Sequence, residues 1–499
     1  MLLAPVGELR AQASPGPVVN AEALTPILQA AVSRRVDVIG IGDSNQGHQG
    51  LGWDHGWQAA LSKRYPMYAT GWMGQGPTSI GYKYVCVGGL STSGALPELD
   101  SIFDVDRSII LPRYAWQASG PTAQRVEFAL ESGVPLDVGA TLVLRREIAL
   151  FPSETYPPQG SFTEFARRAD TYATLWATGA LGTAAAGSGG AFLADTYELG
   201  IAPILPPDPA RRGVQFEWYS GRQGQTDVVG PFFVGLSCIE NADATAGFSY
   251  TTLVYAGGSS LRDMAFALQE ARAQPMLVNM FQRVRARQPQ PDKRVIFTIN
   301  SGLNDREETL PSVGLNPLLP GNSVPAFTDN ANATIATLLS AWNAAGGNDN
   351  EVYFILTGSH PVADADAQGV YPGPEGLLRG YRRAFADIAL ERPRTAAVIL
   401  DALTTSAELL ARGWYLYHFD KHHLKASGYE AIAARQLAAI EAVAGCWADL
   451  NVDRRIDIED LYEFFSAPVD LNLDGASTNG DSVCLIRAVR STEVDDLPL

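Results

Sequence analysis

The sequence predicts an α/β protein in which helices cover both faces of a five-stranded parallel sheet. Five short runs rich in β-branched residues are almost continuously apolar, which is typical of strands buried on both faces. These runs are Val36–Ile41, Tyr250–Tyr255, Val295–Ile299, Val352–Leu356 and Ala397–Leu400. Segments with apolar residues at helical spacing alternate with the later runs, and this alternation is typical of a parallel sheet with helices on both sides.

The expected helices follow the period of 3.6 residues. One lies near Trp57–Tyr65, directly after the first strand. The others are expected at Leu261–Arg285, Asn332–Ala345, Gly376–Glu391 and Ser427–Val443.

A long segment after the first helix interrupts this alternation. It contains short runs with a period of two, which are Gln124–Leu130, Thr141–Leu150, Val214–Tyr219 and Pro231–Ser237, separated by Gly and Pro. A loop of this length without regular structure would be unusual in a compact protein. We therefore predict an inserted, β-rich lobe.

The chain is divided accordingly into a discontinuous α/β domain and three accessory parts. The α/β domain takes residues 20–70 and 250–445, and the inserted lobe takes residues 71–249. Residues 1–19 form an N-terminal linker. Residues 446–490 form a small, acidic C-terminal module, and residues 491–499 form a tail.

The composition excludes several classes of protein. Among 499 residues the formal net charge is −17, whereas a nucleic-acid binder needs a basic face against the phosphates. The same charge argues against electrostatic attachment to an anionic membrane. No run of apolar residues is long enough to predict a membrane span. Hydrophobic residues make up 46% of the chain, which is ample for a packed core.

Two motifs point to nucleophilic catalysis. The first strand runs directly into Gly42-Asp43-Ser44, so Ser44 is expected at the carboxyl edge of the sheet, where doubly wound folds place their sites. Near the C-terminal end of the α/β domain, Asp420 precedes His423 by three residues. At this spacing the Asp can accept a hydrogen bond from one imidazole nitrogen, while the other nitrogen faces a nucleophile.

Two further strand ends carry groups that can donate to an oxyanion. The strand at Tyr250–Tyr255 is followed by Gly257 and Gly258, and the strand at Val295–Ile299 is followed by Asn304. A backbone amide and an asparagine side chain at such positions can stabilise the negative charge that develops during acyl transfer.

These four blocks, in this order, resemble the SGNH hydrolases, also called the GDSL esterase family. The blocks are Gly42-Asp43-Ser44, then Gly258 (with Gly257 as the alternative), Gly302-Leu303-Asn304-Asp305, and Asp420 with His423 and Gly428. The resemblance implies a flavodoxin-like fold for residues 20–70 and 250–445. It leaves the lobe and the C-terminal module unexplained. Asn45 follows the serine where many family members have leucine.

The resemblance also implies roles for these residues. Ser44 would be the nucleophile, His423 the general base and Asp420 the residue that orients the base. The amides of Ser44 and Gly258 and the side chain of Asn304 would form the oxyanion hole. No cofactor is implied for catalysis.

Three further residues near the strand ends are candidates for substrate binding. Trp53 and His55 follow the nucleophile in a Gly- and Trp-rich loop, and His360 follows the fourth strand. Packing within the loop is the alternative for His55, and a position in the core is the alternative for Trp53.

The C-terminal module carries oxygen ligands at the spacing of a twelve-residue Ca²⁺ loop, twice. We expect two structural Ca²⁺ ions there, because a solvated acidic tail does not explain the repeated spacing. The ligands of the first loop are expected at Asp449, Asn451, Asp453, Arg455 (through its carbonyl), Asp457 and Asp460. Those of the second loop are expected at Asp470, Asn472, Asp474, Ala476 (through its carbonyl), Thr478 and Asp481.

With Asp at position 12 and two short loop–helix units, this segment resembles a type I dockerin. The resemblance implies a small α-helical module, export to a secreted or cell-surface location and a cohesin-like partner. Arg454 departs from it by replacing the expected glycine. A disulfide between Cys446 and Cys484 is favoured over two thiols, whereas both alternatives stay open for Cys86 and Cys238.

Together these features favour a serine ester hydrolase that removes acetyl groups from carbohydrates through an acyl-enzyme. The alternatives are a lipase or general acyl-ester hydrolase, and a non-catalytic, calcium-dependent surface or adhesion protein on a hydrolase fold. The substrate expected for the first is an acylated carbohydrate or a small ester.

Overall fold

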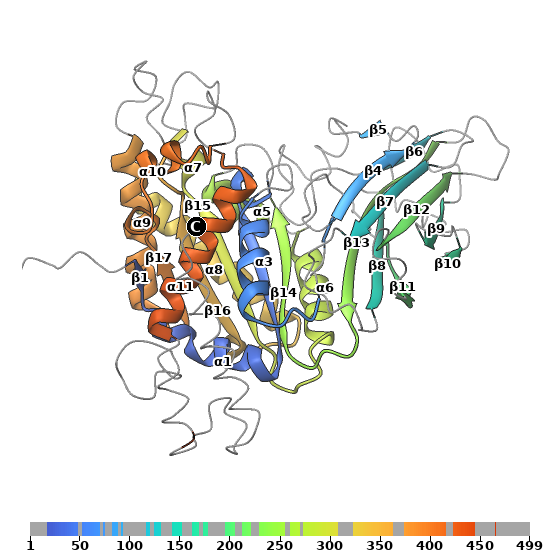
Figure 1. The fold of residues 1–499 in the computed structure, drawn as a ribbon, viewed down its shortest axis with the longest axis horizontal. Coiled ribbons are helices and arrows are strands. Elements are labelled where there is room, and N and C mark those ends of the chain that lie inside the picture. Colours follow the sequence, from blue (N-terminus) through green and yellow to red (C-terminus); the bar gives the residue numbers. More distant parts are fainter. Residues whose placement is uncertain are drawn as a thin grey trace, which may run out of the picture.

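A computed structural model shows an α/β domain with helices on both sides of a mixed sheet and a β-rich lobe beside it (Figure 1). The α/β class is therefore confirmed. The structure describes residues 17–47, 52–69, 73–74, 82–87, 91–92, 116–119, 124–130, 142–151, 162–168, 173–177, 195–204, 212–220, 229–254, 260–269, 273–307, 323–362, 374–415, 423–444 and 465.

The central sheet has the strand order β1-β17-β16-β15-β2-β14. All neighbours from β17 to β14 pair in parallel, whereas β1, which the sequence analysis did not predict, pairs antiparallel with β17 at the edge. The bounds are β1 (Val18–Val19), β2 (Arg35–Gly42), β14 (Gly247–Val254), β15 (Val295–Ser301), β16 (Val352–Gly358) and β17 (Thr395–Val398). The last strand begins and ends two residues before the predicted run, because the chain turns into a 3₁₀ helix at Leu400–Ala402.

Alternate residues of each strand contribute their side chains to two separate hydrophobic cores, one on each face of the sheet. On β15, Val295, Phe297 and Ile299 face one core, which is covered by α5 (Leu261–Gln269), α6 (Ala273–Ala286), α8 (Val324–Ala344) and α9 (Pro374–Glu391). Ile296 on the same strand faces the other core, which is covered by α1 (Thr25–Ser33), α3 (Trp53–Arg64) and α11 (Ala426–Ala444). The near-continuous apolar runs in the sequence thus reflect burial on both faces.

The helices lie close to the predicted segments, with two differences. The helix predicted at Asn332–Ala345 begins eight residues earlier, at Val324, and ends at Ala344. The segment predicted as one helix at 261–285 is divided into α5 and α6, with residues 270–272 between them outside the described part. The bounds are α1 (Thr25–Ser33), α2 (Ser44–Gly47), α3 (Trp53–Arg64), α5 (Leu261–Gln269), α6 (Ala273–Ala286), α7 (Leu303–Glu307), α8 (Val324–Ala344), α9 (Pro374–Glu391), α10 (Ser406–Ala411) and α11 (Ala426–Ala444). None of the helices in the described ranges meets the length and apolarity of a membrane-crossing segment.

The lobe consists of two antiparallel sheets that lie beyond the β14 edge of the central sheet (Figure 1). One has the order β10-β9-β12-β7-β4, and the other has the order β11-β8-β13-β6-β5 with β3 also on β13. The bounds are β3 (Met73–Gly74), β4 (Tyr82–Val87), β5 (Ser91–Thr92), β6 (Trp116–Ser119), β7 (Gln124–Leu130), β8 (Leu142–Phe151), β9 (Phe162–Arg168), β10 (Thr174–Ala177), β11 (Asp195–Ile204), β12 (Arg212–Ser220) and β13 (Val229–Asn241).

A buried polar cluster joins the lobe to the N-terminal end of β2. Arg287 pairs with Asp37 of β2, and its Nη1 also donates to the sulfur of Cys238 on β13 at 3.0 Å. Arg35 Nη1 donates to Glu240 Oε1 at 2.5 Å. Cys238 is thus a buried thiol rather than half of a disulfide, which favours the thiol alternative for this residue.

Candidate active site

The turn that carries the candidate nucleophile is held by the residue before it. β2 ends at Gly42, and Ser44 is the first residue of the short helix α2. The carboxylate of Asp43 accepts the backbone N–H of Asn45 at 2.8 Å and its side-chain amide at 3.1 Å, as a capping residue does. Ser44 is therefore placed at the carboxyl edge of the sheet.

Gln46 binds this turn to the strands on either side of β2. Its Nε2 donates to Tyr250 Oη on β14 at 2.9 Å, and its Oε1 accepts Asn300 Nδ2 on β15 at 2.7 Å. Gln46 is fully buried. A Cβ on Gly40 would lie 2.2 Å from Gln46 Nε2, so glycine at this strand position makes room for the bridge.

The segment after β15 brings Asn304 to the same edge. Gly302 has φ +121°, a conformation that residues with a side chain rarely adopt, and α7 follows directly. Asn304 is buried in this first turn. Its neighbour Asp305 accepts the N–H of Leu261, at the start of α5, at 3.0 and 3.1 Å, and the hydroxyl of Ser301 at 3.1 Å.

Asp305 thereby fixes the beginning of α5, the helix that follows β14 in the chain. Ser260 caps α5: its Oγ accepts the N–H of Asp263 at 3.2 Å, and the Asp263 carboxylate accepts the N–H of Ser260 at 3.0 Å. Gly258 and its alternative Gly257 lie just before this cap and outside the described residues.

The segment of the candidate base contacts the nucleophile turn through one tyrosine. His423 is half-buried and precedes α11, while its predicted partner Asp420 lies outside the described residues. Tyr429 Oη donates to Asn45 Oδ1 at 2.7 Å and accepts the N–H of Leu424 at 3.3 Å. Residues 45 and 424 follow Ser44 and His423 directly, so the structure brings these two predicted segments together.

Two of the three predicted substrate-binding residues are buried beneath this contact. Trp53 is 1% exposed and His360 is fully buried. The ring of Trp53 lies 5.0 Å from that of Tyr429 and 6.2 Å from that of His360, both edge to face. This packing supports the walls of the site, and direct contact with a substrate stays a prediction for both residues.

His55, the third of these residues, lies on the first turn of α3 and its Nε2 pairs with Glu430 Oε1 of α11. Its neighbour Asp54 is buried, and this burial raises the pKa of the Asp54 carboxyl to about 7, although the backbone N–H groups of His55, Gly52 and Asp54 itself lower it. The imidazole of His55 thus links α3 to α11, whereas the carboxyl of Asp54 accepts the N–H of His55 at the start of its own helix.

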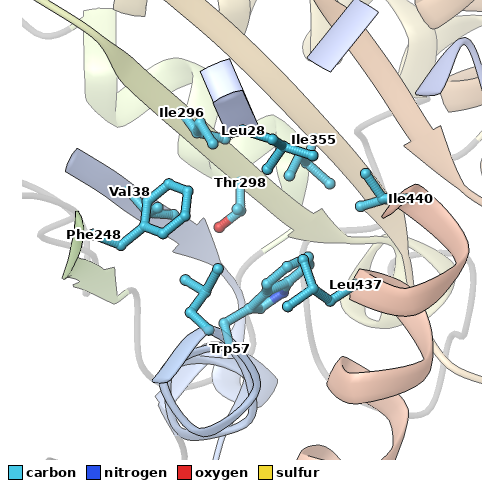
Figure 2. A pocket seen from close by; sticks show the side chains of 10 residues that line it. Leu28, Val38, Trp57, Phe248, Ile296, Thr298, Ile355, Leu437 and Ile440 are labelled. Carbon is cyan, nitrogen blue, oxygen red and sulfur yellow. The ribbon is translucent and has the colours of Figure 1, made fainter. Parts of the chain in front are cut away.

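One internal cavity lies away from this edge. It has a volume of about 10 Å³ and lies between the sheet and helices α3 and α11, lined by apolar side chains such as Trp57, Leu437 and Ile440 (Figure 2). Among the described residues that line it, Thr298 is the one with a hydroxyl group, and the others are aliphatic or aromatic. This is a small gap in the second core, too small and too apolar for a substrate.

Two residues that organise this edge, Gln46 and Tyr429, were not predicted from the sequence. The hydrogen bonds of Asn45 to both neighbours were not predicted either. The sequence did offer a sign that Asn45 has a polar role, because many SGNH hydrolases have leucine at this position. The predicted Ca²⁺ ligands, from Asp449 to Asp481, and the disulfide of Cys446 with Cys484 lie outside the described residues. In the part that is described, no cluster of His, Cys, Asp and Glu could hold a metal ion.

Comparison with known proteins supports the fold. No protein-family model and no curated protein matches the chain. A solved structure described as a peptidoglycan O-acetylesterase is similar over 86% of this chain and 99% of the other, with a TM-score of 0.52 and 13% identity. The two chains share a fold.

Smaller parts of the chain match other solved esterases. A catalytic mutant of an acetylxylan esterase from Geobacillus stearothermophilus matches over 39% of this chain and 73% of its own, with 18% identity and a TM-score of 0.25. The acetyl xylan esterase AlAXEase matches over 38% and 81%, with 16% identity and a TM-score of 0.25.

Proposed function

We propose that this protein is a serine ester hydrolase of the SGNH type that removes acetyl groups from carbohydrates. The observation that carries the proposal is the contact of the Ser44 turn with the His423 segment, through Asn45, Tyr429 and Leu424. Asn304 follows β15, the neighbour of β2, and so lies at the same carboxyl edge of the sheet. The five parallel strands lie across the central sheet in the order β14-β2-β15-β16-β17, which is the order 2-1-3-4-5 of flavodoxin-like folds. This order supports the SGNH assignment.

The proposed reaction proceeds in two acyl-transfer steps. Ser44 Oγ attacks the ester carbonyl while His423 takes the hydroxyl proton, and Asp420 orients the imidazole. The amides of Ser44 and Gly258 and the side chain of Asn304 stabilise the oxyanion. The intermediate then collapses with cleavage of the bond to the sugar oxygen, His423 gives its proton to that oxygen so that the sugar leaves as an alcohol, and water hydrolyses the acetyl-enzyme by the same route.

The choice of an acetylated carbohydrate rests on two associations. The structure that shares the fold is described as a peptidoglycan O-acetylesterase. The dockerin-like segment after residue 445 is typical of exported proteins that act on polysaccharides. We therefore expect hydrolysis of O-acetyl groups from glycans outside the cell, with a cohesin-like partner for the C-terminal module.

We also propose that two Ca²⁺ ions stabilise this module without a part in ester hydrolysis. The support is the oxygen-ligand spacing from Asp449 to Asp460 and from Asp470 to Asp481. Titration calorimetry with Ca²⁺ should give about two sites, and Asp453→Ala with Asp474→Ala should remove them while acetyl-ester hydrolysis continues. Full Ca²⁺ binding by the double variant contradicts this assignment.

Hydrolysis of p-nitrophenyl acetate, acetylated xylan and O-acetylated peptidoglycan by Ser44→Ala and by wild type tests the enzymatic proposal. We expect Ser44→Ala to lose at least about 10³-fold in kcat, and a fluorophosphonate to label wild type alone. Ser62→Ala, which alters a serine on α3 that is bonded to Ala59 O, is the matched control. Full activity in Ser44→Ala overturns the proposal, and a preference for long acyl chains replaces the carbohydrate substrate with a lipid ester.

A further inference from the structure

We propose that Tyr429 is a positioning residue, which holds the segment of the candidate base against the turn of the candidate nucleophile. This inference rests on the proposed function and adds a residue outside the four sequence blocks. Tyr429 is fully buried on the first turn of α11. Its hydroxyl connects Asn45, the residue after Ser44, with Leu424, the residue after His423.

The directions of the hydrogen bonds are set by the neighbouring groups. Asn45 Nδ2 donates to Asp43 Oδ1 at 3.1 Å, which turns Asn45 Oδ1 toward Tyr429. A phenol has a single hydroxyl proton, and Asn45 Oδ1 can only accept a hydrogen bond, so the Tyr429 hydroxyl donates its proton to Asn45. The oxygen of Tyr429 is then left to accept the N–H of Leu424, and a three-group chain results.

The ring of Tyr429 is held independently of these hydrogen bonds. It packs edge to face against Trp53 with centroids 5.0 Å apart. The backbones of α3 and α11 also approach each other closely here. A Cβ on Gly56 of α3 would lie only 2.5 Å from the carbonyl oxygen of Tyr429, so glycine is needed at this position. The helices α3 and α11 thus meet at this point, and replacement of Tyr429 by Phe keeps the packing while it removes the hydroxyl.

The hydroxyl therefore sets the spacing between two segments that are about 380 positions apart in the chain. Proton transfer between a serine and an imidazole needs hydrogen-bond distance between them. A displacement of about 1 Å at a reacting group can lower the rate about 10²-fold. We expect Tyr429→Phe to lower kcat about 10- to 100-fold, with KM changed less than about twofold because no substrate contact is lost.

The matched control is Tyr353→Phe. Tyr353 is 2% exposed and its hydroxyl accepts a hydrogen bond from Arg294 at 3.1 Å, but it lies at the beginning of β16, at the opposite end of the sheet. Both variants lose one buried phenol hydroxyl. Only Tyr429→Phe should lower kcat, slow the fluorophosphonate reaction and move the midpoint of the pH–rate profile.

A double-mutant cycle identifies the partner. Asn45→Leu removes the acceptor, so we expect a loss in kcat of similar size and little further loss when it is combined with Tyr429→Phe. Independent, multiplying losses would contradict the bonded pair. Hydrogen exchange at the Leu424 amide, which needs no activity, should be faster in Tyr429→Phe than in Tyr353→Phe.

The outcomes separate the two proposals. Activity that survives in Ser44→Ala overturns the proposed function and the positioning role with it. Ser44-dependent activity with equal kcat, equal pH profile and equal Leu424 exchange in the two tyrosine variants overturns the positioning role alone.

Discussion

The carboxylate of Asp305 accepts the backbone N–H of Leu261 through both of its oxygens, at 3.0 and 3.1 Å. Asp305 is 3% exposed and adjoins Asn304, while Leu261 begins α5. The negative charge faces the N-terminal end of a helix, where it is favourable. One carboxylate thus holds two of the segments that carry predicted oxyanion donors.

We expect Asp305→Ala to lower the free energy of unfolding by about 2–3 kcal/mol, because the buried N–H of Leu261 loses a charged acceptor. The same change should lower kcat about tenfold or more through displacement of the Asn304 turn. Urea unfolding and acetyl-ester kinetics measure the two effects. Asp387→Asn on α9, where the side chain is 56% exposed, is the control that should change neither.

The free energy of unfolding should depend on pH through the titration of the Asp54 carboxyl. Burial raises the pKa of this carboxyl from 3.8 to about 7 in the folded protein. The folded state then binds one more proton than the unfolded state between these values, so the contribution of Asp54 to stability is fully present below about pH 4 and is lost as the pH rises to about 7. The change amounts to at most about 4 kcal/mol.

Asp54→Asn should remove this dependence, because the amide does not titrate. Urea unfolding of both proteins at intervals between about pH 4 and 7 measures the difference in slope. Asp54 is buried with its carboxylate bonded to the N–H of His55 at 2.7 Å, so the variant should fold with the same helix start. Parallel stability curves for the two proteins would be inconsistent with a carboxyl that titrates in this range.

Replacement of only one partner of the buried ion pair between Arg287 and Asp37 should lower the free energy of unfolding strongly. The two side chains are 2% and 0% exposed, and Gln288 Nε2 also donates to Asp37 at 2.8 Å. Arg287→Met leaves a buried carboxylate without its cation, and we expect a loss of about 3–5 kcal/mol. Arg287→Met with Asp37→Asn should lose clearly less than the sum of the single changes.

Denaturant titrations of the single and double variants measure this coupling. Arg383→Met removes the exposed ion pair with Asp387 and should cost less than about 1 kcal/mol. Strict additivity of the Arg287 and Asp37 changes would show that the two charges do not depend on each other.

Leu437 tests whether the second core contributes to the site. It lines the small cavity of Figure 2 and is 1% exposed. Leu437→Ala enlarges this cavity, and we expect a loss of about 2–5 kcal/mol in the free energy of unfolding. Because the cavity lies below the sheet and away from its carboxyl edge, KM for acetyl esters should stay unchanged at temperatures where the variant is folded. A large increase in KM would place the cavity in the path of the substrate.

Much of the α/β domain follows from local patterns in the sequence. The apolar runs at β15 and β16 reflect strands with both faces buried, and each face has its own helices. Strand β1 was missed because it has two residues, and its pairing with β17 joins positions 380 residues apart. The division between α5 and α6 was missed because apolar residues continue at helical spacing on both sides of it.

The sequence by itself predicted which residues would carry out acyl transfer: Ser44 after a strand, and His423 and Asn304 near helix starts. Only the tertiary structure decided how these segments are held, through Gln46 across three strands and through Tyr429 between Asn45 and Leu424. Spacing along a chain reports the period of a helix or a strand, because both repeat locally. A hydrogen bond between residues about 380 positions apart leaves no such period, so only the packing of α3, α11 and the sheet brings its partners together.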